Sequence, residues 1–389
     1  MSLPAGLPER DLTPDSRMRV LTINAGSSSV KLALFAVDAD ETRIASAAAE
    51  RVADHTGALR TELARMQASL DASPPDAVAH RIVHGGPRYQ DPVRITDDVR
   101  DDLRALTSID PDHMPQSLAA IGAIGEIYPA VPQVACFDTA FHHTLPRVAQ
   151  MYALPRRFWD TGVRRYGFHG LSCEYILRAL TQIDSRAAAG RVIVAHLGSG
   201  ASLTAVQHGR SIETTMGFSP TGGVVMGTRT GDLDPGVLVH ASQAGALDAD
   251  ALSRLVNHDA GLLGVSQTSQ DMRDLLEREA VDPRAADAIA LFCYSVKKAI
   301  GSLVAVLGGL DTLVFTAGIG ERAAAIRQRI CNGLDTAFGV DVDHTRNEQG
   351  AGVISPDGAV VTVRVMATDE DRMLARHAAD VLAAGDRDV

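Results

Sequence analysis

Lysine is scarce in this chain, and its positions exclude one class of nucleotide enzyme. Of 37 lysines and arginines, only Lys31, Lys297 and Lys298 are lysines, and they are followed by leucine, lysine and alanine. A P-loop binds phosphate through a lysine that stands between glycine and serine or threonine. The chain is therefore not a P-loop enzyme.

Positive charge and long apolar runs are also in short supply. The net charge is −11 at pH 7, which argues against a nucleic-acid surface, because phosphate backbones need clustered positive charge. No uncharged run approaches the roughly 18 apolar residues of a membrane span. We therefore expect neither nucleic-acid nor membrane partners, and we favour chemistry on small molecules.

Paired cysteines and targeting signals are missing as well. The four cysteines are far apart and form no CxxC motif, namely Cys136, Cys173, Cys293 and Cys331. Such thiols are expected to be reduced and buried, as in a cytoplasmic protein. Residues 1–17 are rich in proline and charge and lack an apolar stretch. We predict that they form a loose N-terminal extension rather than a signal or transit peptide.

One short pattern occurs twice in the chain. Residues 19–27 return as residues 191–199, and in each copy an apolar run rich in β-branched residues meets a Gly/Ser-rich turn and a second apolar run. The pattern predicts two hairpins. Their turns, at 26–29 and 198–200, expose backbone N–H groups that suit a phosphate. Because 389 residues exceed what one core supports, we expect two domains with a nucleotide held between them.

Apolar spacing and turn residues predict the remaining elements. We expect buried strands over 77–83, 133–137, 312–316 and 360–366. We expect helices over 115–128, 172–181, 248–257, 272–279 and 284–307, and a last helix that ends near 382. Ser172 is expected to be the N-cap of its helix, and 216–236 a long loop without regular structure.

Charged side chains follow several of these strands or lie in glycine-rich loops. Asp138 and Glu370 stand at or just past strand ends, where α/β proteins bind ligands, and carboxylates are ligands of Mg²⁺. Arg81 and Arg229 lie beside polar, glycine-rich segments, and two guanidinium groups at one site suit a phosphoryl group. His169 is able to donate to such a group. Each has a structural alternative: caps for the carboxylates, ion pairs for the arginines and a plain loop for the histidine.

The run 318–323 matches GxGxxA between an expected strand and helix, which is the context of a dinucleotide fingerprint. An NAD-dependent enzyme is therefore an alternative. The duplicated hairpins have no place in a Rossmann domain, so we favour a turn that binds phosphate or ribose.

Eight segments, in order along the chain, resemble the acetate kinase family, whose superfamily includes actin, sugar kinases and heat-shock ATPases. The likeness runs from Met18 to about His377. The segments are Ile23-Asn24-Ala25-Gly26-Ser27-Ser28-Ser29-Val30-Lys31, His80-Arg81-Ile82-Val83-His84-Gly85-Gly86, Phe137-Asp138-Thr139-Ala140-Phe141-His142, Arg165-Tyr166-Gly167-Phe168-His169-Gly170, His196-Leu197-Gly198-Ser199-Gly200, Met226-Gly227-Thr228-Arg229, Phe315-Thr316-Ala317-Gly318-Ile319-Gly320-Glu321 and Thr368-Asp369-Glu370.

The resemblance implies a duplicated actin-like (ribonuclease H-like) α/β fold with the active site in a cleft between two domains. After the extension at 1–17, the first domain would comprise 18–141 plus 372–389. The second, nucleotide-binding domain would comprise 142–371. The resemblance also implies a homodimer.

The family's reaction is the reversible transfer of a phosphoryl group from ATP to acetate, with Mg²⁺ or Mn²⁺, to give acetyl phosphate and ADP. By matching position, the residues implied in catalysis are Arg81, Asp138, His169 and Arg229, of which His169 and Arg229 would stabilise the transition state. Arg81, Val83, Phe168 and Pro220 would bind the carboxylate substrate, and Asn24 and Glu370, with Asp138, the metal. ATP would contact Lys31, His196, Gly198, Ser199, Gly200, Asp271, Met272, Arg273, Gly318, Ile319 and Gly320.

The chain departs from the family pattern at two positions. Asp112 stands where the family commonly has a leucine of the acyl pocket, so either its loop turns the carboxylate away or the substrate is more polar than acetate. Ser199 replaces the usual asparagine. Propionate or another short-chain acid is the alternative substrate, and a nucleotide-binding member without catalysis is the alternative function.

Overall fold

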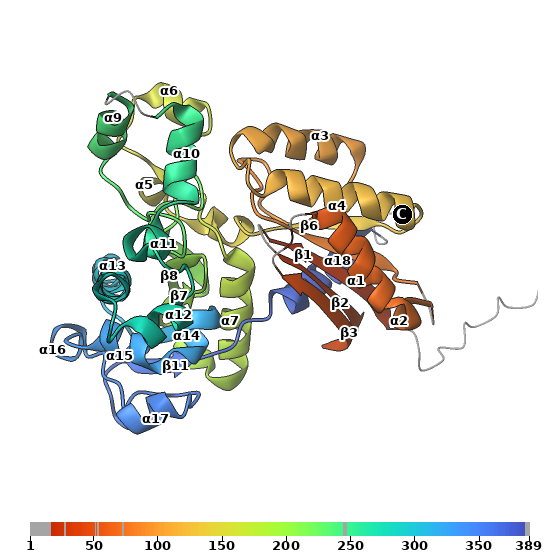
Figure 1. Cartoon of the computed structure of the whole chain (residues 1–389). Coiled ribbons are helices and arrows are strands. Elements are labelled where there is room, and N and C mark those ends of the chain that lie inside the picture. The colour runs from red at the N-terminus through yellow and green to blue at the C-terminus, as the bar shows by residue number, and fades with distance from the viewer. Residues whose placement is uncertain are drawn as a thin grey trace, which may run out of the picture.

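Figure 1 shows a molecule of two lobes, each built on one β-sheet with helices against it. The computed structural model describes residues 17–26, 29–50, 52, 54–71, 74–243 and 247–385. The expected N-terminal extension lies outside these residues except for Arg17, and so do Ser27 and Ser28 of the first turn.

The first lobe contains a six-stranded sheet in the order β3-β2-β1-β4-β6-β5. Its strands are β1 (Met18–Ala25), β2 (Ser29–Val37), β3 (Glu41–Glu50), β4 (Ala77–Ile82), β5 (Val93–Arg94) and β6 (Gln133–Phe137). β1, β2 and β3 pair antiparallel, and β4 and β6 continue parallel to β1. α1 (His55–Arg65) and α4 (Met114–Ile127) share one apolar cluster with the sheet, and α18 (Glu370–Gly385) shares another.

The second lobe repeats this plan in a five-stranded sheet of order β11-β10-β7-β8-β9. Its strands are β7 (Arg191–Leu197), β8 (Ala201–Gln207), β9 (Arg210–Thr214), β10 (Thr312–Thr316) and β11 (Thr362–Val365). An antiparallel hairpin is again extended by two parallel strands. Both predicted hairpins and the duplicated α/β fold are therefore confirmed.

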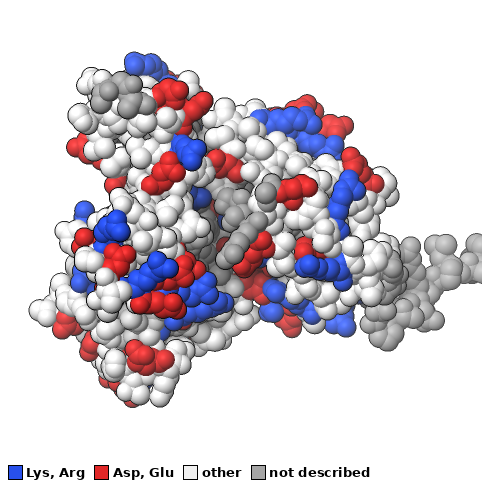
Figure 2. All heavy atoms as spheres, viewed as in Figure 1, with Lys and Arg blue, Asp and Glu red and all other residues white. Residues whose placement is uncertain are grey.

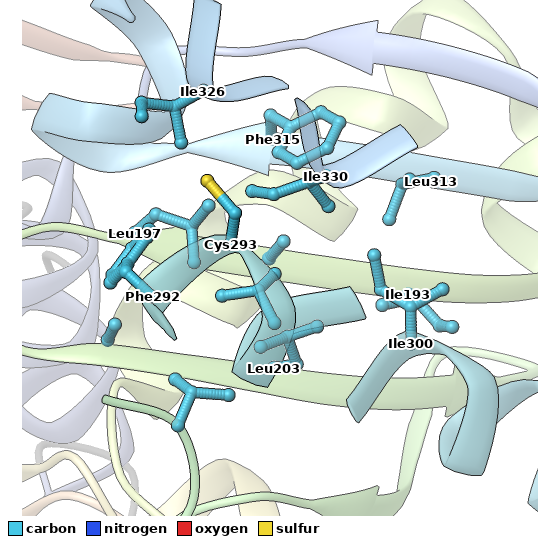
Figure 3. Close-up of a cluster of buried hydrophobic side chains, with 14 of the residues drawn as sticks. Ile193, Leu197, Leu203, Phe292, Cys293, Ile300, Leu313, Phe315, Ile326 and Ile330 are labelled. Carbon is cyan, nitrogen blue, oxygen red and sulfur yellow. The ribbon is translucent and has the colours of Figure 1, made fainter. Parts of the chain in front are cut away.

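The largest apolar cluster lies between the second sheet and α13 (Pro283–Leu307) (Figure 3). Phe292 and Ile300 of α13 are fully buried in this cluster with Leu203 and Phe315 of the strands. In the described part of the chain, α13 is the one helix long and apolar enough to cross a membrane. Its buried side contributes to that composition, because a core helix must bury an apolar stripe.

The remaining helices are mostly short. They are α2 (Gln67–Asp71), α3 (Asp97–Ala105), η1 (Leu106–Ser108), η2 (Ala140–Thr144), α5 (Arg147–Gln150), α6 (Arg156–Asp160), α7 (Gly170–Ile183), α8 (Ser185–Ala189), α9 (Pro235–Gln243), α10 (Ala249–Asn257), α11 (Gly261–Ser266), α12 (Met272–Arg278), α14 (Ala317–Arg322), α15 (Ala324–Cys331), α16 (Asp335–Phe338) and α17 (His344–Glu348). Of these, η2 and α5 to α8 connect the two sheets, and the others lie between strands of one sheet. All four cysteines are buried and unpaired, as expected.

One predicted cap is wrong. α7 begins at Gly170, so Ser172 lies inside the helix and His169 is the N-cap. His169 has φ 59°, in the left-handed region that non-glycine residues rarely adopt. Gly170 N–H donates to the Asp138 carbonyl at 2.8 Å, which turns the chain into the helix two residues earlier than the sequence suggested. The Ser172 side chain therefore does not cap the helix, and its hydroxyl contacts His196 instead.

Candidate active site

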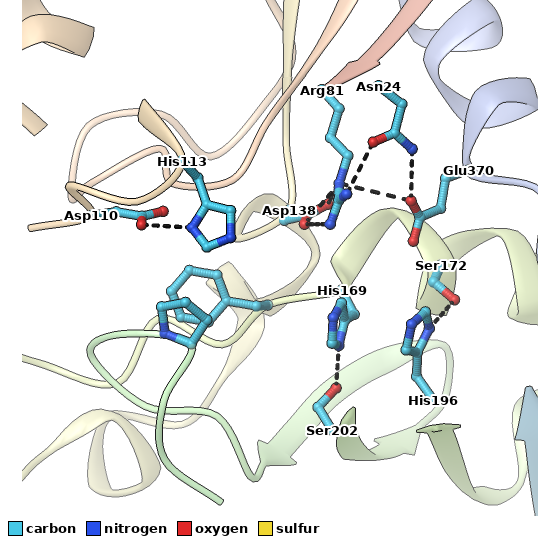
Figure 4. Close-up of polar contacts among 12 residues, drawn as sticks. Asn24, Arg81, Asp110, His113, Asp138, His169, Ser172, His196, Ser202 and Glu370 are labelled. Carbon is cyan, nitrogen blue, oxygen red and sulfur yellow. Dashed lines mark hydrogen bonds and ion pairs between the residues drawn. The ribbon is translucent and has the colours of Figure 1, made fainter. Parts of the chain in front are cut away.

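Polar side chains from three neighbouring strands of the first sheet gather at one edge (Figure 4). Asn24 lies near the end of β1, Arg81 near the end of β4, and Asp138 directly follows β6. Glu370, the first residue of α18, completes the group. The parallel pairing of these strands brings their carboxyl ends together.

Arg81 is the centre of this group. Its Nε donates to both carboxylate oxygens of Asp138, at 3.1 and 3.0 Å, and one terminal nitrogen donates to Asp138 Oδ2 at 2.5 Å. The other terminal nitrogen donates to Asn24 Oδ1 at 3.0 Å, and Asn24 Nδ2 donates to Glu370 Oε2 at 3.1 Å. Bidentate pairing of this kind fixes the guanidinium plane.

The group has more carboxylates than guanidinium groups. Two largely buried carboxylates, Asp138 and Glu370, share the single guanidinium of Arg81. Burial raises the pKa of Asp138 against the opposing effect of Arg81. Burial also opposes ionisation of Glu370, but Arg81 and neighbouring donors outweigh it and lower the Glu370 pKa. Buried carboxylate oxygens with excess negative charge, beside an amide oxygen, fit a hard divalent cation such as Mg²⁺.

Two histidines of the second lobe lie beside this group. His169 precedes α7 and His196 lies near the end of β7. Their rings stack at 4.0 Å between centroids, with an interplanar angle of 16°. Burial, the other histidine and the charges of Arg81 and Arg229 lower the pKa of His169 well below its usual range. Burial lowers the pKa of His196 to about 4. Both rings are therefore neutral at pH 7.

The glycine-rich turn 198–200 leaves room for a ligand beside these rings. A Cβ placed on Gly200 would lie 3.4 Å from His169 Nε2 and 3.5 Å from an Arg229 terminal nitrogen. The space that a side chain would fill is thus bordered by an imidazole and a guanidinium. Gly198 N–H donates to the Gly200 carbonyl at 3.0 Å, which closes the turn.

Arg229 is held in the cleft from both lobes. One terminal nitrogen donates to the Pro220 carbonyl at 3.3 Å, and the other donates to His113 Nε2 at 3.4 Å. His113 Nδ1 lies 2.8 Å from the buried carboxylate of Asp110. Because Arg229 is only a donor, His113 Nε2 accepts and its Nδ1–H donates to Asp110. Burial lowers the pKa of Arg229 against the opposing charges of Asp110 and Asp112.

The residues expected around the acyl group are buried together, and Asp112 faces away from them. Val83 and Phe168 belong to one apolar cluster, and Pro220 is buried beside Arg229. Asp112 Oδ2 pairs instead with His258 Nε2, which follows α10 in the second lobe, at 3.2 Å. Of the two sequence-based explanations for Asp112, this geometry favours the one in which the loop turns its carboxylate away.

Apart from His196 and the turn 198–200, the expected ATP contacts fall in three places. Lys31 is opposite Asn24 in the β1–β2 ladder. Asp271 caps α12 and pairs with Arg273 at 2.7 Å, while the Met272 side chain is buried in the second core. Gly318, Ile319 and Gly320 form α14 directly after β10. The strand-to-helix context of GxGxxA is present, but the sheet's antiparallel hairpin is not that of a Rossmann domain, so the NAD alternative loses its support.

Sequence reasoning missed four residues that orient the site. Asp110 and His113 hold Arg229 from across the cleft. Ser202 and Ser172 contact the two stacked histidines through hydrogen bonds of 2.9 and 2.8 Å. Ser202 lies in β8, directly after the glycine-rich turn. The sequence pattern indicates only that its side chain is on the inward face of a hairpin. Ser172 was misassigned as a cap.

Comparison with known proteins gives a consistent result for nearly the whole chain. A family model described as "Acetokinase family" matches residues 46–376. An acetate kinase of Rhizobium meliloti is 45% identical over 392 residues, which cover 94% of this chain and 98% of that protein. An acetate kinase of Rhodopseudomonas palustris is 42% identical over 388 residues, which cover 92% and 97%.

Solved structures agree with the sequence comparison. A crystal structure of Porphyromonas gingivalis acetate kinase superposes with a TM-score of 0.84 at 34% identity, and a propionate kinase from Francisella tularensis with a TM-score of 0.84 at 32% identity. Each match covers 94% of this chain and 100% of the other. At this similarity the fold is the same.

We predict that Gly200→Ala weakens anion binding without unfolding the protein. The added methyl group makes only ordinary contacts at 3.4 and 3.5 Å, but it occupies the space between His169 and Arg229. We expect affinity for MgATP, measured by calorimetry, to fall about tenfold or more, with the unfolding temperature unchanged within about 2 °C.

The matched control is Gly122→Ala, on an exposed position of α4 with no atom within 4 Å of the new Cβ. This variant should bind MgATP normally. Unchanged affinity in Gly200→Ala would show that the turn does not border the phosphate site.

Proposed function

The chain belongs to the acetokinase family, and on that premise we propose that it transfers the γ-phosphoryl group of ATP reversibly to acetate, giving acetyl phosphate and ADP. One observation from the structure carries the proposal. Two donors of the second lobe, Arg229 and His169, border the same small space above Gly200, and Arg81 of the first lobe is fixed beside them. Phosphoryl transfer is catalysed mainly by such alignment and charge neutralisation.

The proposed step needs no proton transfer. An acetate oxygen forms a bond to the γ-phosphorus while the bond from that phosphorus to the β,γ-bridging oxygen breaks, and its electrons leave with ADP. The nucleophile is already a carboxylate, so the neutral His169 acts as a hydrogen-bond donor rather than as a base. Arg229 and Arg81 offset the negative charge of the reacting oxygens, and Arg81 also holds the acetate carboxylate.

We propose that Asn24 and Glu370, with Asp138, hold Mg²⁺ or Mn²⁺. The excess negative charge of this oxygen-rich group supports the assignment. When bound, the ion supplies charge neutralisation and alignment of the nucleotide phosphates.

The proposed ATP contacts are Lys31, His196, Gly198, Ser199, Gly200, Asp271, Met272, Arg273, Gly318, Ile319 and Gly320.

The proposed domain division assigns 18–141 plus 372–389 to the first domain and 142–371 to the second. The packing of α18 on the first sheet supports this division.

The proposed acyl pocket is lined by Val83, Phe168 and Pro220. Propionate is the alternative substrate, because one structurally similar protein is a propionate kinase.

We also propose a cytoplasmic homodimer. Four buried, unpaired cysteines are typical of a reducing compartment. Large apolar side chains are exposed just before α6 and on α9: Leu154 is 51%, Val237 46% and Val239 53% exposed. Figure 1 draws α6 and α9 at one end of the second lobe. Exposed apolar side chains of this kind mark interaction surfaces.

In Figure 2, acidic and basic side chains intermix on the visible face, which shows no extended basic patch.

The direct test of the reaction is trapping of acyl phosphate by hydroxylamine, with MgATP and with acetate, propionate, butyrate or a hydroxy acid. We expect acyl hydroxamate with acetate, and Arg229→Ala should reduce kcat by about 100-fold or more while the unfolding temperature stays near that of the wild type. Near-normal turnover by Arg229→Ala would refute its role. ATP binding without product from any acid would favour a nucleotide-binding protein without catalysis.

The Asp112–His258 pair is predicted to keep a competing carboxylate away from Arg229. His258→Ala frees Asp112, and we expect KM for acetate to rise about three- to tenfold with little change in kcat. Adding Asp112→Asn should reverse the effect, because it removes the competing charge. If the double variant keeps the raised KM, the pair does not act by charge.

The dimer surface is tested by light scattering. The wild type should have twice the 41.1 kDa mass of one chain. Val237→Asp with Val239→Asp should give monomers, because charge in an apolar interface is costly. Val281→Asp, at an exposed position between α12 and α13, serves as the control and should leave the dimer intact. A monomeric wild type, or a dimeric double variant, would contradict the proposed surface.

A further inference from the structure

Two buried serines each hold one ring of the stacked histidine pair. Ser202 Oγ lies 2.9 Å from His169 Nδ1, and Ser172 Oγ lies 2.8 Å from His196 Nδ1. Both serines are buried, with 1% and 0% of their surface exposed. Figure 4 shows the two pairs side by side, with Ser202 on the far side of the His169 ring from Arg81.

The other ring nitrogen of each histidine is directed to the glycine-rich turn. His169 Nε2 lies 3.4 Å from the position of a Cβ on Gly200, and His196 Nε2 lies 4.0 Å from that on Gly198. Nε2 of both rings therefore lies beside the turn. A phosphate oxygen there is only an acceptor, so both Nε2 atoms must carry a proton to bind it.

The serines decide where the proton of each ring is. In the described part of the chain, neither hydroxyl has another hydrogen-bond partner. If Nδ1–H donated to the serine, the buried hydroxyl hydrogen would have no acceptor, and leaving such a group unpaired is unfavourable. If instead the hydroxyl donates to Nδ1, each group is satisfied and the ring proton is on Nε2.

A third pair in the same lobe provides an internal precedent. His142 Nδ1 lies 2.9 Å from Ser211 Oγ, and His142 Nε2 lies 2.9 Å from the Phe168 carbonyl. The carbonyl is only an acceptor, so His142 carries its proton on Nε2 and Ser211 donates to Nδ1. The contact between Ser211 and His142 thus has the same geometry as the two serine contacts in the site. At His142 the Phe168 carbonyl fixes the tautomer as Nε2–H.

We propose that Ser202 and Ser172 are positioning residues that hold His169 and His196 as Nε2–H tautomers, so that both rings donate into the turn 198–200 toward the phosphoryl groups. The assignment rests on the proposed function for its ligand but on this geometry for the tautomers. Tautomers matter here because the rings are neutral: their lowered pKa values leave only one N–H on each ring.

The tautomers are measured by ¹⁵N NMR of histidine-labelled, full-length protein without ligand at pH 7.5, with His169→Asn and His196→Asn spectra for assignment. We expect Nε2–H for both rings in the wild type, and averaged nitrogen shifts for the affected ring in Ser202→Ala and Ser172→Ala. A wild-type His169 or His196 with the proton on Nδ1 would overturn the proposal. This result does not depend on catalysis, so it stands apart from failure of the proposed reaction.

Kinetics separate positioning from packing. Ser202→Ala should lower kcat about tenfold or more with KM values within about threefold, because His169 faces the group in transfer. Ser172→Ala should chiefly raise KM for ATP, because His196 faces bound phosphate.

The matched control is Ser211→Ala, which removes a serine–histidine bond of the same length at His142, whose Nε2 faces the Phe168 carbonyl rather than the turn 198–200. It should lower the unfolding temperature but leave kcat within about twofold. Unchanged kcat in Ser202→Ala, or an equal loss in Ser211→Ala, would refute a positioning role.

Discussion

The contact between Asp138 and Arg81 is the interaction on which the rest of the site depends. The side chain of Asp138 is almost fully buried and accepts from two nitrogens of Arg81. Its carbonyl accepts from Gly170 N–H, directly after His169. A Cβ on Gly170 would lie only 2.2 Å from that carbonyl, so a glycine is required there. One residue of the first lobe thus fixes both a guanidinium and the start of α7 in the second lobe.

Burial and the neighbouring charges keep Arg81 charged and the two histidines neutral, so these groups act differently on a bound anion. Arg81 stays charged because two carboxylates face it, and its pKa is raised. The stacked histidines stay neutral because burial and nearby arginines disfavour a further positive charge. The cleft therefore combines permanent charge for the reacting oxygens with neutral donors whose direction is set by serines. Such preorganised polar groups are the main source of catalysis in phosphoryl transfer.

Local patterns predicted the elements and the strand-end residues well, because buried strands and helices leave clear periodicities. The hairpins β1–β2 and β7–β8 and the position of Asp138 after β6 are examples. β3 and α1 were missed, because the alanine-rich sequence of β3 and the mixed sequence of α1 lack a strong period. The left-handed His169, the placement of Ser172 and the Asp112–His258 pair depend on contacts between distant segments. No local pattern encodes them.

During transfer the anion is expected to lie between the two lobes, above Gly200 and within reach of His169, Arg229 and Arg81. A crystal structure of the protein with ADP, Mg²⁺, acetate and a planar phosphoryl mimic such as aluminium fluoride tests it most directly. The account predicts the mimic within hydrogen-bonding distance of His169 Nε2 and an Arg229 nitrogen, with the acetate carboxylate on its far side from ADP. A mimic bound away from the turn 198–200, or contacted by neither residue, would contradict it.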